Sequence, residues 1–189
     1  MGRTSGGSAG GGGGGAMELI SSQVLAAPAG PVVFTAIPGT YNHLKFIIVA
    51  ASAYASNNDL MYITFNADTG DDYDAEELFN SSATAVEFVV SAGNTVLYPD
   101  GPRIAGADAT AGTPGMLELD IPDYAGSTFL KLAKLTGGYV DAQKVSTSIG
   151  WETAFGLWRN TAPITSVSFR SADAANFVVG SAFYMYGIT

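Results

Sequence analysis

The sequence predicts an all-β protein, more specifically an antiparallel β-sandwich of about eight to ten strands with a jelly-roll-like arrangement. Short apolar runs recur along the chain, and loops rich in Gly, Pro, Asn and Asp separate them. Several runs alternate apolar and polar residues, as strands with one buried face do. The one short segment with a helical composition is residues 74–79, so a parallel sheet built from βαβ units is not expected.

The apolar runs predict the strands in chain order. The densest run, residues 41–55, is rich in β-branched side chains and predicts a central strand. Residues 60–65 alternate, with Met61, Ile63 and Phe65 on one face, and residues 116–121 alternate in the same way. Further strands are expected at residues 17–27, 32–34, 86–90 and 95–98 (these two as a hairpin), 129–135, 138–151, 164–169 and 177–188.

Residues 1–16 differ in composition from the predicted sandwich domain, residues 17–189. Nine of the sixteen are Gly, and six are consecutive: Gly10, Gly11, Gly12, Gly13, Gly14 and Gly15. Such a segment buries too little apolar surface to offset the entropy lost on ordering, so it is expected to be flexible alone. Two roles remain open for it: an assembly arm that orders against neighbouring subunits, or a disordered tail.

The charge balance argues against nucleic acid as a partner. The chain has 8 basic and 17 acidic residues, a net charge of −9, and its basic residues are scattered. Phosphate binding needs clustered Lys and Arg, and so does binding to an anionic membrane. Only 13% of residues are charged, about half the usual share. This favours either a protein that hides much of its surface in an assembly or an ordinary sandwich with a neutral polar surface.

Several classes of site and segment are excluded by residue counts. The chain has no Cys, which rules out disulfides, thiolate metal sites and Cys nucleophiles. It contains no run of 18 apolar residues, so no membrane span is expected. The N-terminal residues lack the apolar core of a secretory signal.

An acidic loop offers the one candidate metal site. Asn66, Asp68, Asp72 and Asp74 are separated by two, four and two positions. Oxygen ligands two residues apart on a turning loop suit Ca²⁺. The match to an EF-hand is poor, because Gly70 is at the fifth position from Asn66 and no predicted helix precedes the loop. The alternative is a solvated loop in which Asp and Asn side chains form local turns. Calcium is the only cofactor that the sequence suggests.

Candidate catalytic residues are few, and no enzymatic activity is expected. His43 is the only histidine, and no G-x-S-x-G nucleophile motif accompanies it. Glu118 and Asp120 share one face of a predicted strand about 7 Å apart, which is compatible with an inverting glycosidase pair. Two acids on one strand face more often form its solvent side.

Aromatic side chains in the C-terminal half provide the last candidates. Tyr124, Trp151 and Trp158 are expected to stack on sugar rings or to fill a subunit interface if they are exposed. The alternative is that they pack in the core.

Four segments together resemble the small structural proteins of tailed bacteriophage virions. They are IPGTYNHLKFIIVA (residues 37–50), YITFNADTGDDYD (62–74), DIPDYA (120–125) and the end of the chain, from W through APITSVSF to NFVVGSAFYMYGI (158–188). The shared patterns are I-P-x-T-Y-x-x-L, F-N-x-D-x-G-x-x-Y, I-x-D-Y-A and a final L-Y-G-I. Met185 stands where Leu is commoner, and Asp72 stands where Asn or Ser is commoner.

The resemblance implies a virion component with a jelly-roll-like fold, and it carries over no catalytic residue. We therefore expect a non-enzymatic, surface-exposed homo-oligomer, a trimer, that decorates the capsid and contacts other capsid or tail proteins. The alternative is a tail-associated or fibre-tip module that binds a host-surface glycan with the help of calcium. A fibre shaft is disfavoured because the sequence has neither repeats nor coiled-coil heptads.

Overall fold

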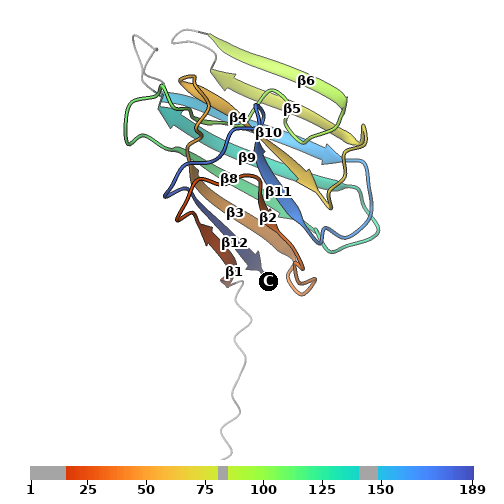
Figure 1. The fold of residues 1–189 in the computed structure, drawn as a ribbon. Helices are drawn as coiled ribbons and strands as arrows, with labels where there is room; N and C mark the ends of the chain where they lie inside the picture. Colours follow the sequence, from red (N-terminus) through yellow and green to blue (C-terminus); the bar gives the residue numbers. More distant parts are fainter. Residues whose placement is uncertain (1–15, 81–84, 141–148) are drawn as a thin grey trace, which may run out of the picture.

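The computed structural model describes residues 16–80, 85–140 and 149–189, and every regular element within these ranges is a β-strand (Figure 1). Twelve strands form two antiparallel sheets, so the predicted all-β sandwich is confirmed with more strands than expected. Within these ranges no helix exists that could cross a membrane. Gly10 to Gly15 lie outside the described residues.

The larger sheet has eight strands in the order β1-β12-β3-β8-β9-β10-β5-β6. β12 pairs with both β1 and β3, so the last strand of the chain lies between two early ones. The bounds of these strands are β1 (Met17–Val24), β12 (Ala182–Ile188), β3 (His43–Ala50), β8 (Gly115–Pro122), β9 (Lys131–Val140), β10 (Ile149–Trp158), β5 (Tyr73–Asn80) and β6 (Val86–Asn94).

The smaller sheet has four strands in the order β2-β11-β4-β7, and it packs on one face of the larger sheet. The two final strands of the chain, β11 and β12, belong to different sheets, so the segment between them crosses the sandwich. The bounds are β2 (Val32–Phe34), β11 (Val167–Ser171), β4 (Asn58–Phe65) and β7 (Arg103–Ala105).

Aromatic rings from both sheets fill the core between them. Phe46 of β3 packs edge-on against Phe34 of β2 and Phe169 of β11, with ring centroids 5.5 and 5.3 Å apart. Trp158 of β10 packs edge-on against Phe65 of β4 at 5.8 Å. The predicted alternation is confirmed, because Met61, Ile63 and Phe65 are all fully buried.

Three local predictions are wrong. The strand predicted over residues 138–151 is divided between the end of β9 and the start of β10, and these two ends pair with each other. Residues 74–79 form no helix; they belong to strand β5, which pairs with β10 and β6. The charges of this segment suit a helix, but pairing on both edges overrides that local preference. The hairpin predicted over residues 86–98 is also absent from the described fold: residues 86–94 are the single strand β6, and Leu97 bridges to Ile63 in the other sheet.

Candidate functional site

The outer face of the larger sheet, which faces away from the smaller sheet, is apolar at one end. Directly opposed residues on neighbouring strands share a face, so the pairing register defines its rows. One row runs from Phe88 through Leu78 to Thr153, and the next runs from Val90 through Glu76 to Phe155. These strands are β6, β5 and β10, which lie side by side at one edge of the sheet (Figure 1).

The side chains at this end form what we call the outer apolar surface. Phe88 is 63% exposed, Phe155 58% and Trp151 40%, which are large values for aromatic side chains. Contiguous exposed apolar patches on monomers commonly mark interaction sites. The members of the outer apolar surface are Leu78, Val86, Phe88, Val90, Leu132, Ile149, Trp151, Phe155 and Leu157.

Few charges interrupt the outer apolar surface. Glu76 and Lys134 flank Phe155 on the neighbouring strands β5 and β9, and both are exposed. At the end of β5 the Asn80 amide replaces backbone pairing, since Oδ1 accepts a hydrogen bond from Trp151 N at 2.7 Å and Nδ2 donates to Ile149 O at 3.1 Å. This contact fixes the backbone from which Trp151 projects.

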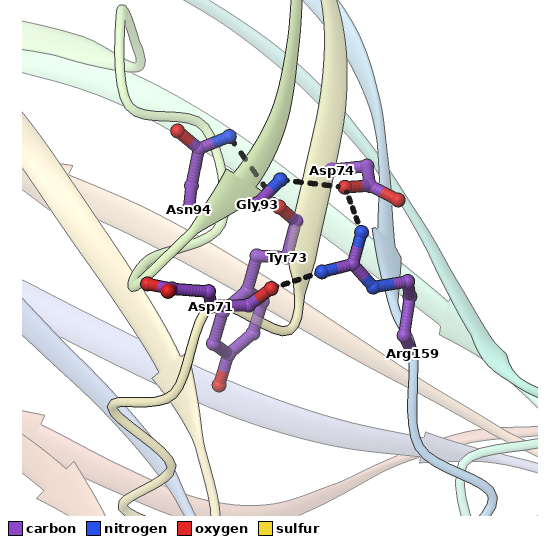
Figure 2. A network of polar contacts seen from close by, with 6 residues as sticks. All are labelled: Asp71, Tyr73, Asp74, Gly93, Asn94 and Arg159. Carbon is purple, nitrogen blue, oxygen red and sulfur yellow. Dashed lines mark hydrogen bonds and ion pairs between the residues drawn. The ribbon is translucent and has the colours of Figure 1, made fainter.

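The C-terminal end of β6 is anchored by a polar clamp (Figure 2). Asp74 Oδ1 accepts hydrogen bonds from Gly93 N at 2.9 Å and from Arg159 Nη1 at 2.7 Å. Asn94 Nδ2 donates to Tyr73 O at 3.4 Å, and the second guanidinium nitrogen of Arg159 donates to Asp71 O. The clamp therefore ties the end of β6 to β5 and to the residue after β10.

Three of the four residues predicted to bind calcium have other partners in the structure. Asn66 Oδ1 accepts from Thr165 N and Ser166 N, and Asp74 belongs to the clamp. Asp68 Oδ2 accepts from Trp158 Nε1 at 2.7 Å, and its Oδ1 accepts from Gly70 N. Among the described residues no group of three His, Cys, Asp or Glu side chains converges as metal ligands would. The loop geometry therefore favours the turn-forming alternative.

Two of the three aromatic candidates are buried. Trp158 is 1% exposed and stacks on Tyr73, and Tyr124 is fully buried with its hydroxyl donating to Pro38 O. Stacking of a sugar on either ring would require the core to open, so the core-packing alternative holds for Trp158 and Tyr124. Trp151 alone is accessible. The alternation of β10 explains the difference, because residues 151 and 158 point to opposite faces.

The glycosidase candidates, Glu118 and Asp120, and the single histidine, His43, have different surroundings. Glu118 and Asp120 share the outer face of β8, as predicted, and both bind Lys45 Nζ of β3, at 2.6 and 3.3 Å. These ion pairs support the alternative that Glu118 and Asp120 belong to the solvent side of the strand. His43 is exposed at the start of β3, where it pairs with Ile188 and Pro122 through the backbone.

A pair of buried carboxyl groups was missed from the sequence. Glu77 of β5 and Glu152 of β10 point inward and are 3% and 6% exposed. Both converge on Gly101: a Cβ atom there would lie 2.9 Å from Glu77 Oε2 and 3.2 Å from Glu152 Oε2. The guanidinium of Arg103 lies over the Phe79 ring, and its Nη1 is 4.0 Å from Glu152 Oε2.

Burial shifts the protonation of this pair. It raises the pKa of Glu77 to about 8, although Asp100 N donates a hydrogen bond to the carboxylate. It raises the pKa of Glu152 to about 7, with Arg103 partly offsetting the shift. At neutral pH the cluster therefore holds a proton. Both groups are too buried to reach a substrate, so their consequence is for stability.

Reading residues 73–80 as a strand would have revealed Glu77. Tyr73, Ala75 and Phe79 are apolar and point inward, and Glu77 falls on the same alternating set. The wrong helix prediction concealed this pattern.

Comparisons with known proteins give no relative for this chain. No family model, no curated protein and no solved structure matches it.

Proposed function

We propose that this chain is a non-enzymatic structural protein of a bacteriophage virion. In this proposal it self-associates on the particle surface as a capsid decoration protein, and it attaches to neighbouring virion proteins through the outer apolar surface. The resemblance of residues 37–188 to tailed-phage structural proteins gives the class. The outer apolar surface is the observation that carries the attachment.

The outer apolar surface supports a protein partner over a small ligand. Its members stand on one face of a sheet, whereas small molecules bind in concave pockets that cover most of their surface. Apolar side chains left in water forgo the free energy of burial, about 25 cal/mol per Å². A surface of this size on a chain with net charge −9 is therefore explained best by a partner that covers it.

Quantitative mass spectrometry of purified particles of the encoding phage tests the class and the location. Isotope-labelled peptides of this chain and of the major capsid protein give the copy number per particle. Capsid decoration predicts copies in proportion to the capsid subunits. A handful of copies indicates a tail-associated protein, and absence from washed particles contradicts the proposal.

Phe155→Ser tests the attachment, with Phe129→Ser as its matched control. Both Phe side chains are more than half exposed, but only Phe155 belongs to the outer apolar surface. We expect Phe155→Ser to lower the particle-bound fraction roughly tenfold or more, since a truncated central aromatic contact costs about 2 kcal/mol. Phe129→Ser should bind like the wild type. Equal binding of the two variants would remove this surface from the proposal.

A host-glycan-binding role remains as the alternative, and the exposed ring of Trp151 is the observation that favours it. Binding on a glycan array that is lost in Trp151→Ala, with the fold retained, would support this role. If chelation of calcium also abolished that binding, the prediction that calcium assists glycan binding would be supported. Binding unaffected by Trp151→Ala would contradict the alternative.

A further inference from the structure

The four edges of the two sheets differ in how well they are protected from pairing with another chain. β2 and β7 have three residues each, too few to pair extensively. β1 carries an irregularity between Leu19 and Ser21, which disturbs the regular edge. Natural proteins use short strands, bulges, Pro and charged residues in this way to keep sheet edges apart.

The edge formed by β6 lacks these protective features. It has nine residues, its sequence VEFVVSAGN contains neither Pro nor Lys, and Glu87 is its only charged residue. Within the part of the chain that the structure describes, no strand pairs with its outer edge. The register shift with β5 falls near its clamped end, opposite Tyr73 and Ala75, and leaves residues 86–91 regular. A regular apolar edge of this kind is a template for strand addition.

The side chains of β6 are self-complementary under antiparallel pairing. Val86, Phe88 and Val90 all project to the outer face, and they are symmetric about Phe88. Pairing centred on Phe88 sets each Val86 opposite Val90 of the other copy. It also sets Glu87 opposite Val89, so the one charged residue does not face its own copy.

We infer that β6 pairs with β6 of a second copy of this chain, antiparallel and around a two-fold axis at Phe88. The eight-stranded sheet continues across the interface, and the two outer apolar surfaces become one. The inference specifies how the self-association in the proposed function takes place. It rests on the proposed function only for the statement that the chain self-associates.

The geometry limits the assembly to two copies. Each chain offers one β6 edge, and antiparallel pairing of identical strands is isologous, so both edges are consumed in the pair. The clamp at Gly93 and Asn94 holds the strand in place before it pairs, which lowers the ordering cost of association. This edge therefore predicts a dimer in place of the trimer expected from the resemblance.

Because the chain has no Cys, single introduced cysteines can test the register of the proposed pairing directly. In an antiparallel pair, opposed Cα atoms are about 4.5–5.5 Å apart, within the range that a disulfide spans. Purified Phe88→Cys should cross-link to a dimer under mild oxidation. Phe155→Cys is the control, since Phe155 is also an exposed aromatic but lies two strands from the edge. Val86→Cys and Val90→Cys should cross-link when mixed and much less when each is alone.

A charge-swap experiment tests the same contact without a covalent bond. We expect Phe88→Lys to weaken dimerisation at least roughly tenfold in light scattering, because like charges then face each other. Phe88→Glu should behave likewise, and mixing the two variants should restore a heterodimer. Circular dichroism and thermal melting verify that each variant folds.

Three results would overturn the inference: a monomeric or trimeric wild type, cross-linking of Phe155→Cys as strong as that of Phe88→Cys, or no recovery on mixing. All these measurements use purified protein without particles. A chain that dimerises in this way but is absent from virions would contradict the proposed function alone, and a virion protein that fails them would contradict the inference alone.

Discussion

Two regions of the same eight-stranded sheet differ in where their charged side chains lie, on the outward face in one and also on the inward face in the other. Around β3 and β8 the inward side chains are apolar, among them Leu44 and Leu119, and the outward ones include the ion-paired Lys45, Glu118 and Asp120. Around β10 and β5 the outward face carries Trp151, Phe155 and Leu78, whereas Glu77 and Glu152 point inward. The first region presents charged side chains on its outer face, and the second presents the apolar side chains that the proposed partner would cover.

The contrast shows what alternation along a strand can and cannot reveal. Alternation identifies a strand and divides its residues between two faces. It does not say which face is covered when both carry apolar side chains. A strand with a carboxyl group on its inward face and exposed aromatic rings on its outward face therefore needs the position of the second sheet to show which face is buried.

The largest effect is expected from two leucines of β9, which separate the buried face from the outer apolar surface. Leu135 is 1% exposed and Leu132 is 55% exposed. Leu135→Ala should lower the free energy of unfolding by about 2–5 kcal/mol, since it removes buried contacts and leaves a cavity. Leu132→Ala should change it by less than about 0.5 kcal/mol. Urea unfolding of the isolated protein measures both, and a similar loss for Leu132→Ala would break the comparison.

An intermediate effect should follow from the inward carboxyl pair as pH changes. The folded-state pKa values of Glu77 and Glu152 lie above the ordinary value of 4.5, so folding favours their protonated forms. Their contribution to stability is therefore fully present below about pH 4.5 and is lost as pH rises through about 7 to 8. Urea unfolding of the wild type should accordingly show a free energy of unfolding that declines over this range.

The matched variants Glu77→Gln and Glu76→Gln sharpen this expectation. Glu77→Gln should flatten the pH profile and stabilise the protein by about 1–2 kcal/mol at pH values near 8.5, because the side chain no longer ionises. Glu76 is exposed on the next position of the same strand, and Glu76→Gln should leave the profile unchanged. A wild-type profile that rises toward alkaline pH would refute the assigned shift.

The smallest effect is expected in the water-facing region. Lys45→Met leaves Glu118 and Asp120 without their shared cation and should lower stability by about 0.5–1 kcal/mol, as exposed ion pairs typically do. The loss should shrink in high salt because screening weakens both the attraction and the remaining repulsion. A loss of the same size at low and high salt would contradict an electrostatic origin of this effect.

The sandwich was predictable because its central strands obey local rules. Residues 60–65 and 116–121 alternate cleanly, and the structure buries Met61, Ile63, Leu117 and Leu119 as expected. The edge of the larger sheet was less predictable. β5 carries three acidic residues in eight, and only its pairing with β10 and β6 makes it a strand.

The candidate surface was only partly predictable for a related reason. Trp151 and Trp158 are both on β10, and knowledge of the strand would have placed them on opposite faces. Which face lies inside depends on where the smaller sheet packs, and that is set by contacts between residues far apart in the chain. The carboxyl pair depends on the same long-range geometry, because Glu77 and Glu152 meet only through the β5–β10 register.

The position of β12 between β1 and β3 has a consequence for how this protein reaches its native state. Its two neighbours are early strands, and neither can complete its backbone pairing until the last strand arrives between them. Contacts of such long sequence separation slow folding and leave edges open meanwhile. The protein is therefore expected to fold slowly, and β1 and β3 are the edges through which folding intermediates would associate wrongly.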